Sequence, residues 1–168
     1  MAGMGKALDP VMKGLQRMDI YGMPGHLIRR LQQHSTQLFA ARMREAGIDL
    51  TPVQFAAIDA LAARPGIDQA SLAELIAYDR ATIGGVVDRL ESKGLVERTI
   101  RASDRRAREV RLSEAGRQLH RAVLPLVRTV QQDIVAPLCP GEQDAFLAVM
   151  RKLVGTSSDE DGAGTPEA

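Results

Sequence analysis

The chain has 168 residues, of which 45% are hydrophobic, so it can bury one substantial core but not a second large domain. Aromatic residues make up only 3% and tryptophan is absent, which indicates a core of aliphatic side chains on packed helices. The net charge of +1 sums two segments of opposite sign. Residues 98–111 hold six arginines against two acids, a local +4, and residues 155–168 hold four acids and no base, a local −4.

Two further features exclude whole classes of protein. No apolar run approaches the roughly 20 residues that span a bilayer, and the N-terminus lacks the pattern of a signal peptide, so we expect a cytoplasmic protein without membrane contact. The single cysteine, Cys139, excludes an intrachain disulfide and a multi-cysteine metal site. Between Pro137 and Pro140 we interpret it as a small hydrophobic residue in preference to a redox sensor.

The first half of the chain predicts three helices. Residues 24–47 form a long one, since leucines recur on one face and Gly47 supplies a stop. The second opens at Thr51-Pro52-Val53-Gln54, where Thr caps, Pro takes the first helical position and Gln returns a bond; Pro65-Gly66 ends it. Ser71-Leu72-Ala73-Glu74 is another capping box, so we expect a short helix from Leu72 to Ala77.

A fourth helix and a hairpin follow. Asp79 can cap a helix that reaches Lys93, with Gly94 behind it. Its core face is defined by i, i+3, i+4 and i+7 spacing at Ile83, Val86, Val87 and Leu90. Leu95-Val96 and Val110-Leu112 are short β-prone runs around residues 101–107, which have the composition of an exposed basic loop.

The last part of the chain predicts two more helices. Ser113 caps a long one that carries Leu119, Val123, Leu126, Val127 and Val130, and Pro125 inside it predicts a kink. Residues 141–154 give a final helix. The fold class is therefore mostly α with a small β-hairpin, in the order of a winged helix–turn–helix with long helices at both ends.

This order of elements predicts binding to double-stranded DNA, with the fourth helix in the major groove. If its apolar face is buried, the outward residues include Arg80 and Thr82 in the first turn, where the helix dipole favours phosphate. The mid-helix pair Gly84-Gly85 costs about 2 kcal/mol relative to two alanines. Close approach to DNA and close approach to another helix explain that cost equally well. The candidate DNA contacts on these helices are Ser71, Arg80, Ala81, Thr82, Gly84, Gly85 and Arg89.

The basic hairpin supplies a second group of candidate DNA contacts. Asp104 and Arg106 are two residues apart, so Asp104 can orient an arginine side chain while Arg105 points elsewhere. An arginine at the tip of such a loop suits the narrow minor groove. Arg101 completes the group. The alternative is a solvated basic loop without a partner, which the concentration of arginine beside a helix–turn–helix pattern disfavours.

Three runs of the sequence resemble the MarR family of bacterial transcriptional regulators. The first two are Leu72-Ala73-Glu74-Leu75 and Val87-Asp88-Arg89-Leu90-Glu91-Ser92-Lys93-Gly94-Leu95-Val96; the third has two parts, Asp104-Arg105-Arg106 and, five residues later, Leu112-Ser113-Glu114-Ala115-Gly116. The resemblance implies a homodimer, a palindromic operator, a wing arginine at Arg106 that enters the minor groove, and Asp104 as its positioner. Many relatives carry bulkier residues at Gly84-Gly85, which puts base contacts there in doubt. Repression is the mode that the family implies.

The resemblance also divides the chain. It implies an N-terminal arm over residues 1–23, dimerisation helices over 24–50 and 113–154, a DNA-binding domain over 51–112, and beyond it the acidic tail at 155–168, whose composition predicts disorder.

A regulator of this family needs an effector site, which the resemblance implies lies between the dimerisation helices and the DNA-reading part of the chain, Ser71 to Leu112, called here the reading head. His26, Arg30 and His34 are four residues apart and stack on one face of the first helix. They could receive an aromatic carboxylate, with Arg30 binding the carboxylate; Tyr21 and Arg42 are weaker candidates. Residues 26–30 and 78–89 look like the branch that represses aromatic-acid catabolism, such as hydroxynicotinate or hydroxycinnamate pathways. The alternative is a solvated face or contacts at the dimer interface.

Other function classes fit less well. The serines have no neighbouring histidine, the cysteine has no paired base and no phosphate-binding glycine loop follows a strand, so we expect no enzyme and no cofactor. A metal site would need carboxylates that the spacing does not single out, so we expect none. A metal- or redox-responsive regulator of the same fold, and a winged helix used only for protein contacts, remain as alternatives.

Overall fold

A computed structural model describes residues 19–101 and 104–155, with side chains described except at 100–108. The chain divides into two compact units, Met1–Val130 and Gln131–Ala168. The expected acidic tail and most of the expected N-terminal arm lie outside the described residues. Among the residues described, none of the helices is long and apolar enough to cross a membrane.

The first helix begins and ends as predicted. After a short 3₁₀ turn, η1 (Asp19–Gly22), α2 runs from Pro24 to Glu45, and Gly47 follows with a φ of +66°. Only Phe39 and Met43 of this helix are buried. Leu27 and Ile28, near its start, are about half exposed, at 50% and 51%. The apolar face of α2 is therefore only partly covered by its own chain.

The second helix, α3 (Pro52–Ala63), confirms the predicted capping box. The Gln54 amide donates to Thr51 Oγ1 at 3.3 Å, and Gln54 Oε1 accepts from the Thr51 amide at 3.1 Å. Two of the backbone donors that every helix leaves without a partner at its start are thus satisfied.

The expected cap at Ser71, with a helix that begins at Leu72, is wrong. A short strand, β1 (Ile67–Asp68), precedes α4 (Gln69–Leu75), and Asp68 is the cap, since its Oδ1 accepts from the Ser71 amide at 2.9 Å. Pairing with β3 keeps the chain extended up to Asp68, and aspartate caps as well as serine does. The helix also ends before Ala77, which has a φ of +55°.

The fourth helix confirms its prediction. α5 spans Arg80–Ser92, Asp79 Oδ1 accepts from the Thr82 amide at 2.8 Å, and Gly94 has the left-handed φ of +69° expected behind a helix. The four residues of the predicted core face are all buried: Ile83, Val86, Val87 and Leu90.

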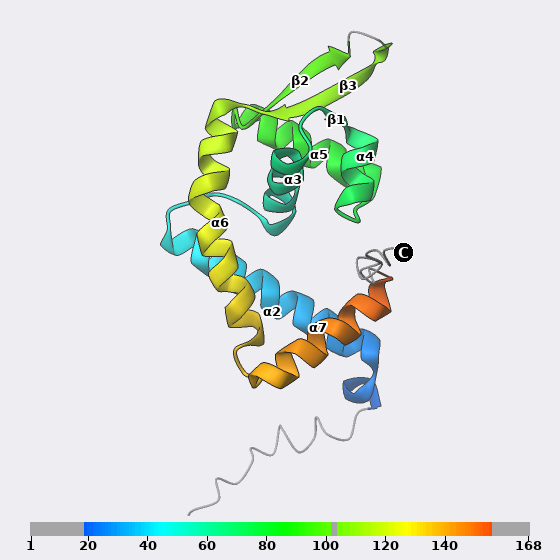
Figure 1. The fold of residues 1–168 in the computed structure, drawn as a ribbon, viewed down its shortest axis with the longest axis vertical. Coiled ribbons are helices and arrows are strands. Elements are labelled where there is room, and N and C mark those ends of the chain that lie inside the picture. The colour runs from blue at the N-terminus through cyan, green and yellow to red at the C-terminus, as the bar shows by residue number, and fades with distance from the viewer. Residues whose placement is uncertain (1–18, 102–103, 156–168) are drawn as a thin grey trace, which may run out of the picture. The chain divides into compact units, whose positions relative to one another are not determined.

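The hairpin is longer than predicted. β2 (Val96–Arg101) and β3 (Asp104–Leu112) pair antiparallel, and β1 joins β3 to give the order β1-β3-β2. The expected loop over 101–107 is wrong, because Arg101 pairs with Asp104 and β3 includes Asp104, Arg105 and Arg106. A register shift between Ile100 and Arg101 accommodates the pairing, so ladder hydrogen bonds override the turn-like composition. Figure 1 shows the two long strands as a ribbon, called here the wing.

α6 (Glu114–Val135) leaves β3 at the predicted cap. Ser113 Oγ accepts from the Gly116 amide at 3.0 Å and donates to the Gly94 carbonyl at 2.6 Å, which joins the end of α5 to the start of α6. The kink at Pro125 stays a prediction. In the second unit, α7 (Pro140–Val154) follows, and Gln143 Nε2 donates to the Leu138 carbonyl at 2.9 Å.

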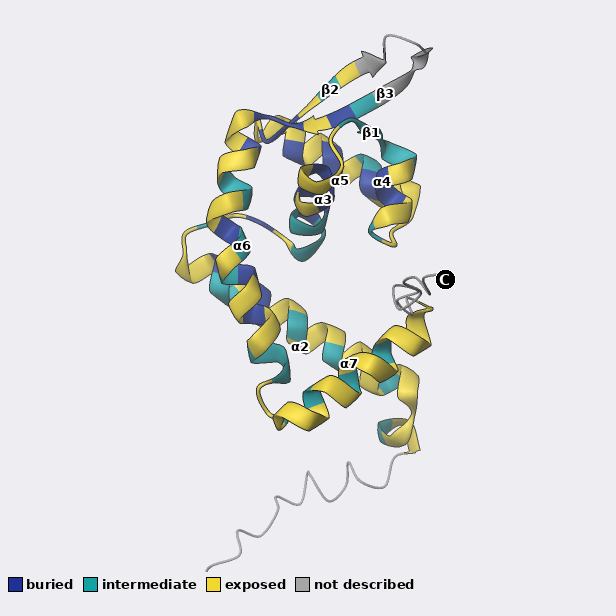
Figure 2. Ribbon diagram, viewed as in Figure 1, coloured by how far each residue is buried: buried dark blue, intermediate teal, exposed yellow. Residues whose placement is uncertain are grey.

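The core of the first unit lies where α3, α4, α5 and the base of the wing meet (Figure 2). Ile58, Leu72, Leu90 and Val110 are fully covered, one from each of these elements. This packing fixes the inner face of α5, and its outer face is therefore left to solvent or to a partner.

Candidate nucleic-acid interface

The outer face of α5 is exposed along its length. Of the residues predicted to point outward, Gly84 is half-buried. The others are exposed: Arg80, Ala81, Thr82, Gly85, Asp88 and Arg89. Because the inner face is fixed by buried aliphatic side chains, this outer face presents a single, defined surface.

The first turn of α5 holds the polar groups that could meet DNA. Arg80 makes one ion pair, from Nη2 to Glu74 Oε1 at 3.5 Å, in which both side chains are three-quarters exposed. Such a pair is weak and leaves the guanidinium available to a phosphate. Thr82 Oγ1 donates to Asp79 Oδ2 at 2.5 Å, so its hydroxyl serves the cap. The hydroxyl and amide of Thr82 lower the pKa of Asp79, which keeps a negative charge at this end of the helix.

Ser71 plays a similar part at α4. Its hydroxyl donates to Asp68 Oδ2 at 3.0 Å and its amide to Oδ1, and these bonds lower the pKa of Asp68. The side chain is exposed. In this structure Ser71 therefore supports the cap, and a DNA contact there stays a prediction.

Gly84 and Gly85 have no close neighbour in the described part of the chain. A Cβ placed on either glycine would meet no atom within 4 Å outside the helix itself. No other helix among the described residues therefore approaches closely enough to require them. Of the two explanations offered by the sequence, packing against a helix of the same chain is not supported.

Sequence reasoning missed the role of Arg98, which it counted with the basic hairpin. The Arg98 side chain is only 16% exposed, and its guanidinium pairs with Asp88 and, at 2.6 Å, with Glu91, both on α5. Arg98 therefore ties β2 to α5. A signal was available: Arg98 is two residues from the buried Val96, so both side chains face the same side of the strand.

The remaining arginines of the wing fall into two groups. Arg111 pairs with Glu109 at 2.9 Å, so its charge is also partly balanced within the wing. The side chains of Arg101, Arg105, Arg106 and Arg108, and that of Asp104, lie outside those described, and the structure gives only their backbone in β2 and β3.

The predicted effector residues on α2 are only partly brought together. The rings of Tyr21 and His26 meet edge to face, 5.1 Å apart, and His26 Nε2 is buried without a hydrogen-bond partner among the described residues. Arg30 and His34 are exposed. Arg42 lies about 24 Å along the helix from His26, since each residue rises about 1.5 Å, and it contacts Glu45 at 3.4 Å. Arg42 therefore does not share a small-ligand site with His26 on the same helix.

The structure also contains a cavity that sequence reasoning did not find. It has a volume of about 430 Å³ and lies between α3, the base of the wing and the start of α6. Among the described residues, no cluster of three or more His, Cys, Asp or Glu side chains could hold a metal ion.

Comparison with known proteins agrees with the resemblance that the sequence shows to the MarR family. The MarR family model matches residues 50–107. The HTH-type transcriptional repressor NicR of Pseudomonas putida is 34% identical to this chain, over 84% of the chain and 87% of NicR.

Two solved structures are similar over most of the chain. The structure of BpsR of Bordetella bronchiseptica, whose DNA binding is regulated by 6-hydroxynicotinic acid, has a TM-score of 0.74 and 29% identity, over 79% of this chain and 93% of that chain. The repressor CouR, bound to a 23-mer DNA duplex, has a TM-score of 0.73 and 28% identity, over 81% of this chain and 95% of that chain. The chain belongs to the MarR family of transcriptional regulators.

Proposed function

We propose that this chain is a dimeric repressor that binds a palindromic DNA operator through α5 and the wing and is released by a small aromatic acid. The observation that carries the DNA-binding part is the outer face of α5, exposed along its length and followed directly by an arginine-rich wing. CouR, of similar structure, is bound to duplex DNA, and NicR is named a repressor.

In this proposal the two parts of the reading head have different tasks. Arg80 and Arg89 stand near opposite ends of the outer face of α5, where they reach phosphates or base edges in the major groove. Arg106 enters the minor groove, where negative potential is concentrated, and Asp104 holds it in position. Arg101 and Arg105 add phosphate contacts, which set affinity more than sequence preference.

The dimer is supported by apolar side chains that each unit leaves exposed. On α2 these include Leu27 and Ile28. On α7 they are Leu147, Val149, Leu153 and Val154. Exposed apolar surface of this kind marks an interaction site, and a second copy of the chain would cover it and set two reading heads on two half-sites.

The effector part rests on the first turns of α2. His26 Nε2 is buried and has no hydrogen-bond partner among the residues that the structure describes, so a ligand group can satisfy it, and the exposed Arg30 is one turn away. Arg30 would bind the carboxylate by two parallel hydrogen bonds while Tyr21 and His26 contact the ring, with His34 one turn beyond Arg30. 6-Hydroxynicotinic acid, which regulates BpsR, is an acid of this class.

The test is an anisotropy titration of the chain on a duplex from its own upstream region, repeated with 6-hydroxynicotinate and related aromatic acids. We expect salt-dependent binding that at least one acid weakens tenfold or more. Arg30→Ala should abolish release and leave DNA affinity unchanged. Failure to bind any duplex would refute the regulator, whereas an Arg30→Ala chain that still responds would refute only the effector site.

A further inference from the structure

The turn that follows α5, from Lys93 to Leu95, is hydrogen-bonded to segments at the ends of both long helices, α2 and α6. On the α6 side, Ser113 Oγ donates to the Gly94 carbonyl at 2.6 Å, and the Ser113 amide donates to the Leu95 carbonyl at 3.0 Å. On the α2 side, Lys93 Nζ donates to Asp49, in the loop that follows α2. The end of α5 is therefore the place where α2 and α6 both attach to the reading head.

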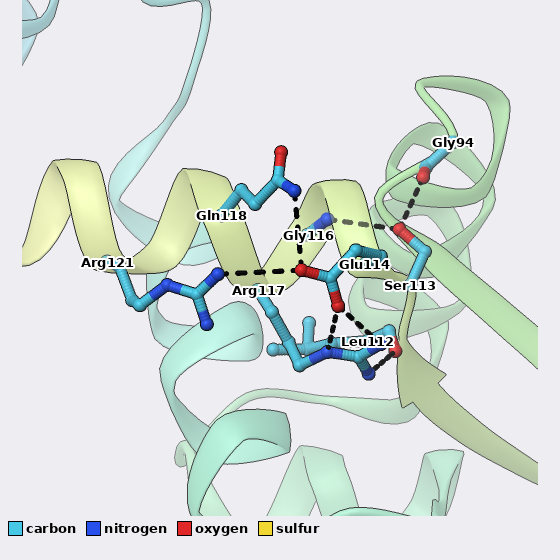
Figure 3. Close-up of polar contacts among 8 residues, drawn as sticks. All are labelled: Gly94, Leu112, Ser113, Glu114, Gly116, Arg117, Gln118 and Arg121. Atoms are coloured by element: carbon cyan, nitrogen blue, oxygen red, sulfur yellow. Dashed lines mark hydrogen bonds and ion pairs between the residues drawn. The ribbon is translucent and has the colours of Figure 1, made fainter.

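The attachment to α6 is closely packed. Figure 3 shows the buried Ser113 hydroxyl between the Gly94 carbonyl and the Gly116 amide. A Cβ on Gly116 would overlap the Leu95 carbonyl oxygen, so the two backbones lie as near to each other as glycine allows. This side of the turn has little room to shift.

The attachment to α2 depends on one long side chain. Lys93 Nζ lies 2.7 Å from the Asp49 carbonyl oxygen and 2.7 Å from Asp49 Oδ2, so the lysine donates to the backbone and the side chain of the same residue. The Asp49 side chain is 91% exposed and that of Lys93 is 31% exposed. Ion pairs this exposed contribute little to the free energy of unfolding. The contact can therefore be removed without unfolding the head.

Asp49 is held to the end of α2 by the bonds that close this helix. The Gly47 amide donates to the Arg44 carbonyl at 3.0 Å, and the Ile48 amide donates to the Met43 carbonyl at 2.9 Å. Gly47 has the left-handed φ that such a helix end requires. A displacement at the end of α2 is therefore passed to Asp49 and, through the lysine, to α5.

The lysine adds a second point of attachment between α2 and the head. The first is a contact of the Phe39 ring of α2 with the Phe55 ring of α3, whose centroids are 6.3 Å apart. One contact leaves a helix free to rotate about it, whereas two separated contacts restrict that rotation. The contact of Lys93 with Asp49 therefore fixes an angle that the aromatic contact leaves open.

From this geometry we propose that Lys93 is a positioning residue, which through Asp49 sets α5 against the end of α2 and so sets the spacing of the two α5 helices of a dimer. The inference rests on the proposed function, since it requires two heads on two half-sites. Simultaneous binding of both heads depends on their spacing, whereas binding of one head does not. Lys93 thus acts through the placement of α5, without a DNA contact of its own.

The experiment compares two duplexes by anisotropy titration with the full chain. One carries the operator from the chain's own upstream region, and the other is the same duplex with one half-site randomised. Lys93→Met removes the ammonium group, Asp49→Ala removes the carboxylate, and the double variant tests whether the two residues act as one unit. Arg128→Ala, which removes a positive charge from an exposed site on α6, is the matched control.

We expect Lys93→Met to weaken binding to the two-half-site duplex about tenfold and to the one-half-site duplex less than about twofold. The double variant should bind no more weakly than Lys93→Met, and Arg128→Ala should match the unsubstituted protein on both duplexes. The thermal midpoint of Lys93→Met should stay within about 3 °C of that of the unsubstituted protein.

Two results of these titrations would overturn the proposal. A direct phosphate contact of Lys93 would make Lys93→Met weaken both duplexes alike and lower the slope of log affinity against log salt. Unchanged affinity of Lys93→Met for both duplexes would show that the lysine sets no spacing.

A second measurement needs no DNA. Hydrogen exchange is followed at the Ile48 amide, which is bonded to α2, and at the Leu95 amide, which is bonded to α5. Lys93→Met should speed exchange at Ile48, and Asp49→Ala at Leu95, by about threefold or more, whereas the control variant should change neither. Unchanged rates at both amides would overturn the proposal. If the unsubstituted protein binds no duplex, or both duplexes alike, the proposed function fails, and the exchange rates still decide whether Lys93 fixes α5 to α2.

Discussion

The reading head buries its apolar side chains within the chain, whereas the first helix, α2, leaves some of its apolar side chains exposed. In the head, Ile83, Val87, Leu90 and Val110 are completely covered by the chain itself. On α2, Leu27 and Ile28 stay half exposed. The head therefore obtains its stability from its own core, whereas α2 offers surface to a partner. Substitutions in the two regions should accordingly affect different properties, folding in one and assembly in the other.

The largest effect is expected at Gly116, where α6 touches the turn after α5. A Cβ there would overlap the Leu95 carbonyl oxygen, which is backbone and cannot move aside. Gly116→Ala should destabilise the protein by about 3 kcal/mol, at the upper end for overpacking. Urea unfolding measures this, and Gly25→Ala, at an open position on α2, is the control. Equal midpoints for the two variants would contradict the packing described.

A substitution on the exposed apolar face of α2 should change assembly and leave folding intact. Ile28→Glu puts a charge on the exposed apolar face and should raise the dimer dissociation constant about 30-fold, the effect of losing roughly 2 kcal/mol at an interface. Sedimentation velocity measures assembly and thermal unfolding reports on the head. If Ile28→Glu lowers the unfolding temperature but leaves the dimer dissociation constant unchanged, the contrast between the two regions is wrong.

Arg98 tests whether the wing must be fixed to α5. Arg98→Ala removes both ion pairs and leaves Asp88 and Glu91 as neighbouring like charges. We expect duplex affinity to fall about tenfold because the wing is held less firmly on the head, while Arg98→Lys should recover part of the loss. A variant with weakened folding but normal DNA affinity would show that the tie only stabilises.

A smaller effect of opposite sign is expected at Gly84. Because a Cβ there meets no described neighbour, Gly84→Ala should stabilise the protein by about 1 kcal/mol, the difference in helix propensity. If DNA approaches this part of α5 closely, the same substitution should weaken duplex binding. Unfolding and anisotropy measurements on one preparation separate the effect on stability from the effect on duplex binding. Tighter duplex binding by Gly84→Ala would argue against close approach of DNA.

The smallest effect concerns pH. The pKa of Asp79 is lowered in the folded state by bonds from Thr82. Its contribution to stability is therefore present above the unfolded value of about 4 and is lost as the pH falls through the lower folded value. Asp79→Asn should reduce the difference in unfolding midpoint between pH 6 and pH 3. An unchanged pH dependence would count against the cap.

Local signals predicted most of the head. Thr51, Asp79 and Ser113 mark helix starts because a cap depends only on residues three apart, and the buried face of α5 follows from its spacing. The errors came from long-range pairing. β1 meets β3 across about 40 residues of chain, so nothing near Asp68 indicated that the extended segment would end there. Asp104 was drawn into a strand by a second pairing, with Arg101 of β2.

The sites divide in the same way. The outward face of α5 could be predicted because it is the complement of a periodic core. Arg98 was missed because a charge count does not show which side chain folds back on an acid. The cavity was missed because its arginines come from β3 and from α6, and only the fold places them around one space.

The most direct test of the central claim, that the wing and α5 bind DNA together, is the salt dependence of duplex binding for Arg106→Ala against Arg128→Ala. We predict that Arg106→Ala weakens binding about tenfold and lowers the slope of log affinity against log salt by about 1, as loss of one phosphate-neutralising cation requires. Arg128→Ala should match the unsubstituted protein. Equal affinities and slopes for all three proteins would contradict the account.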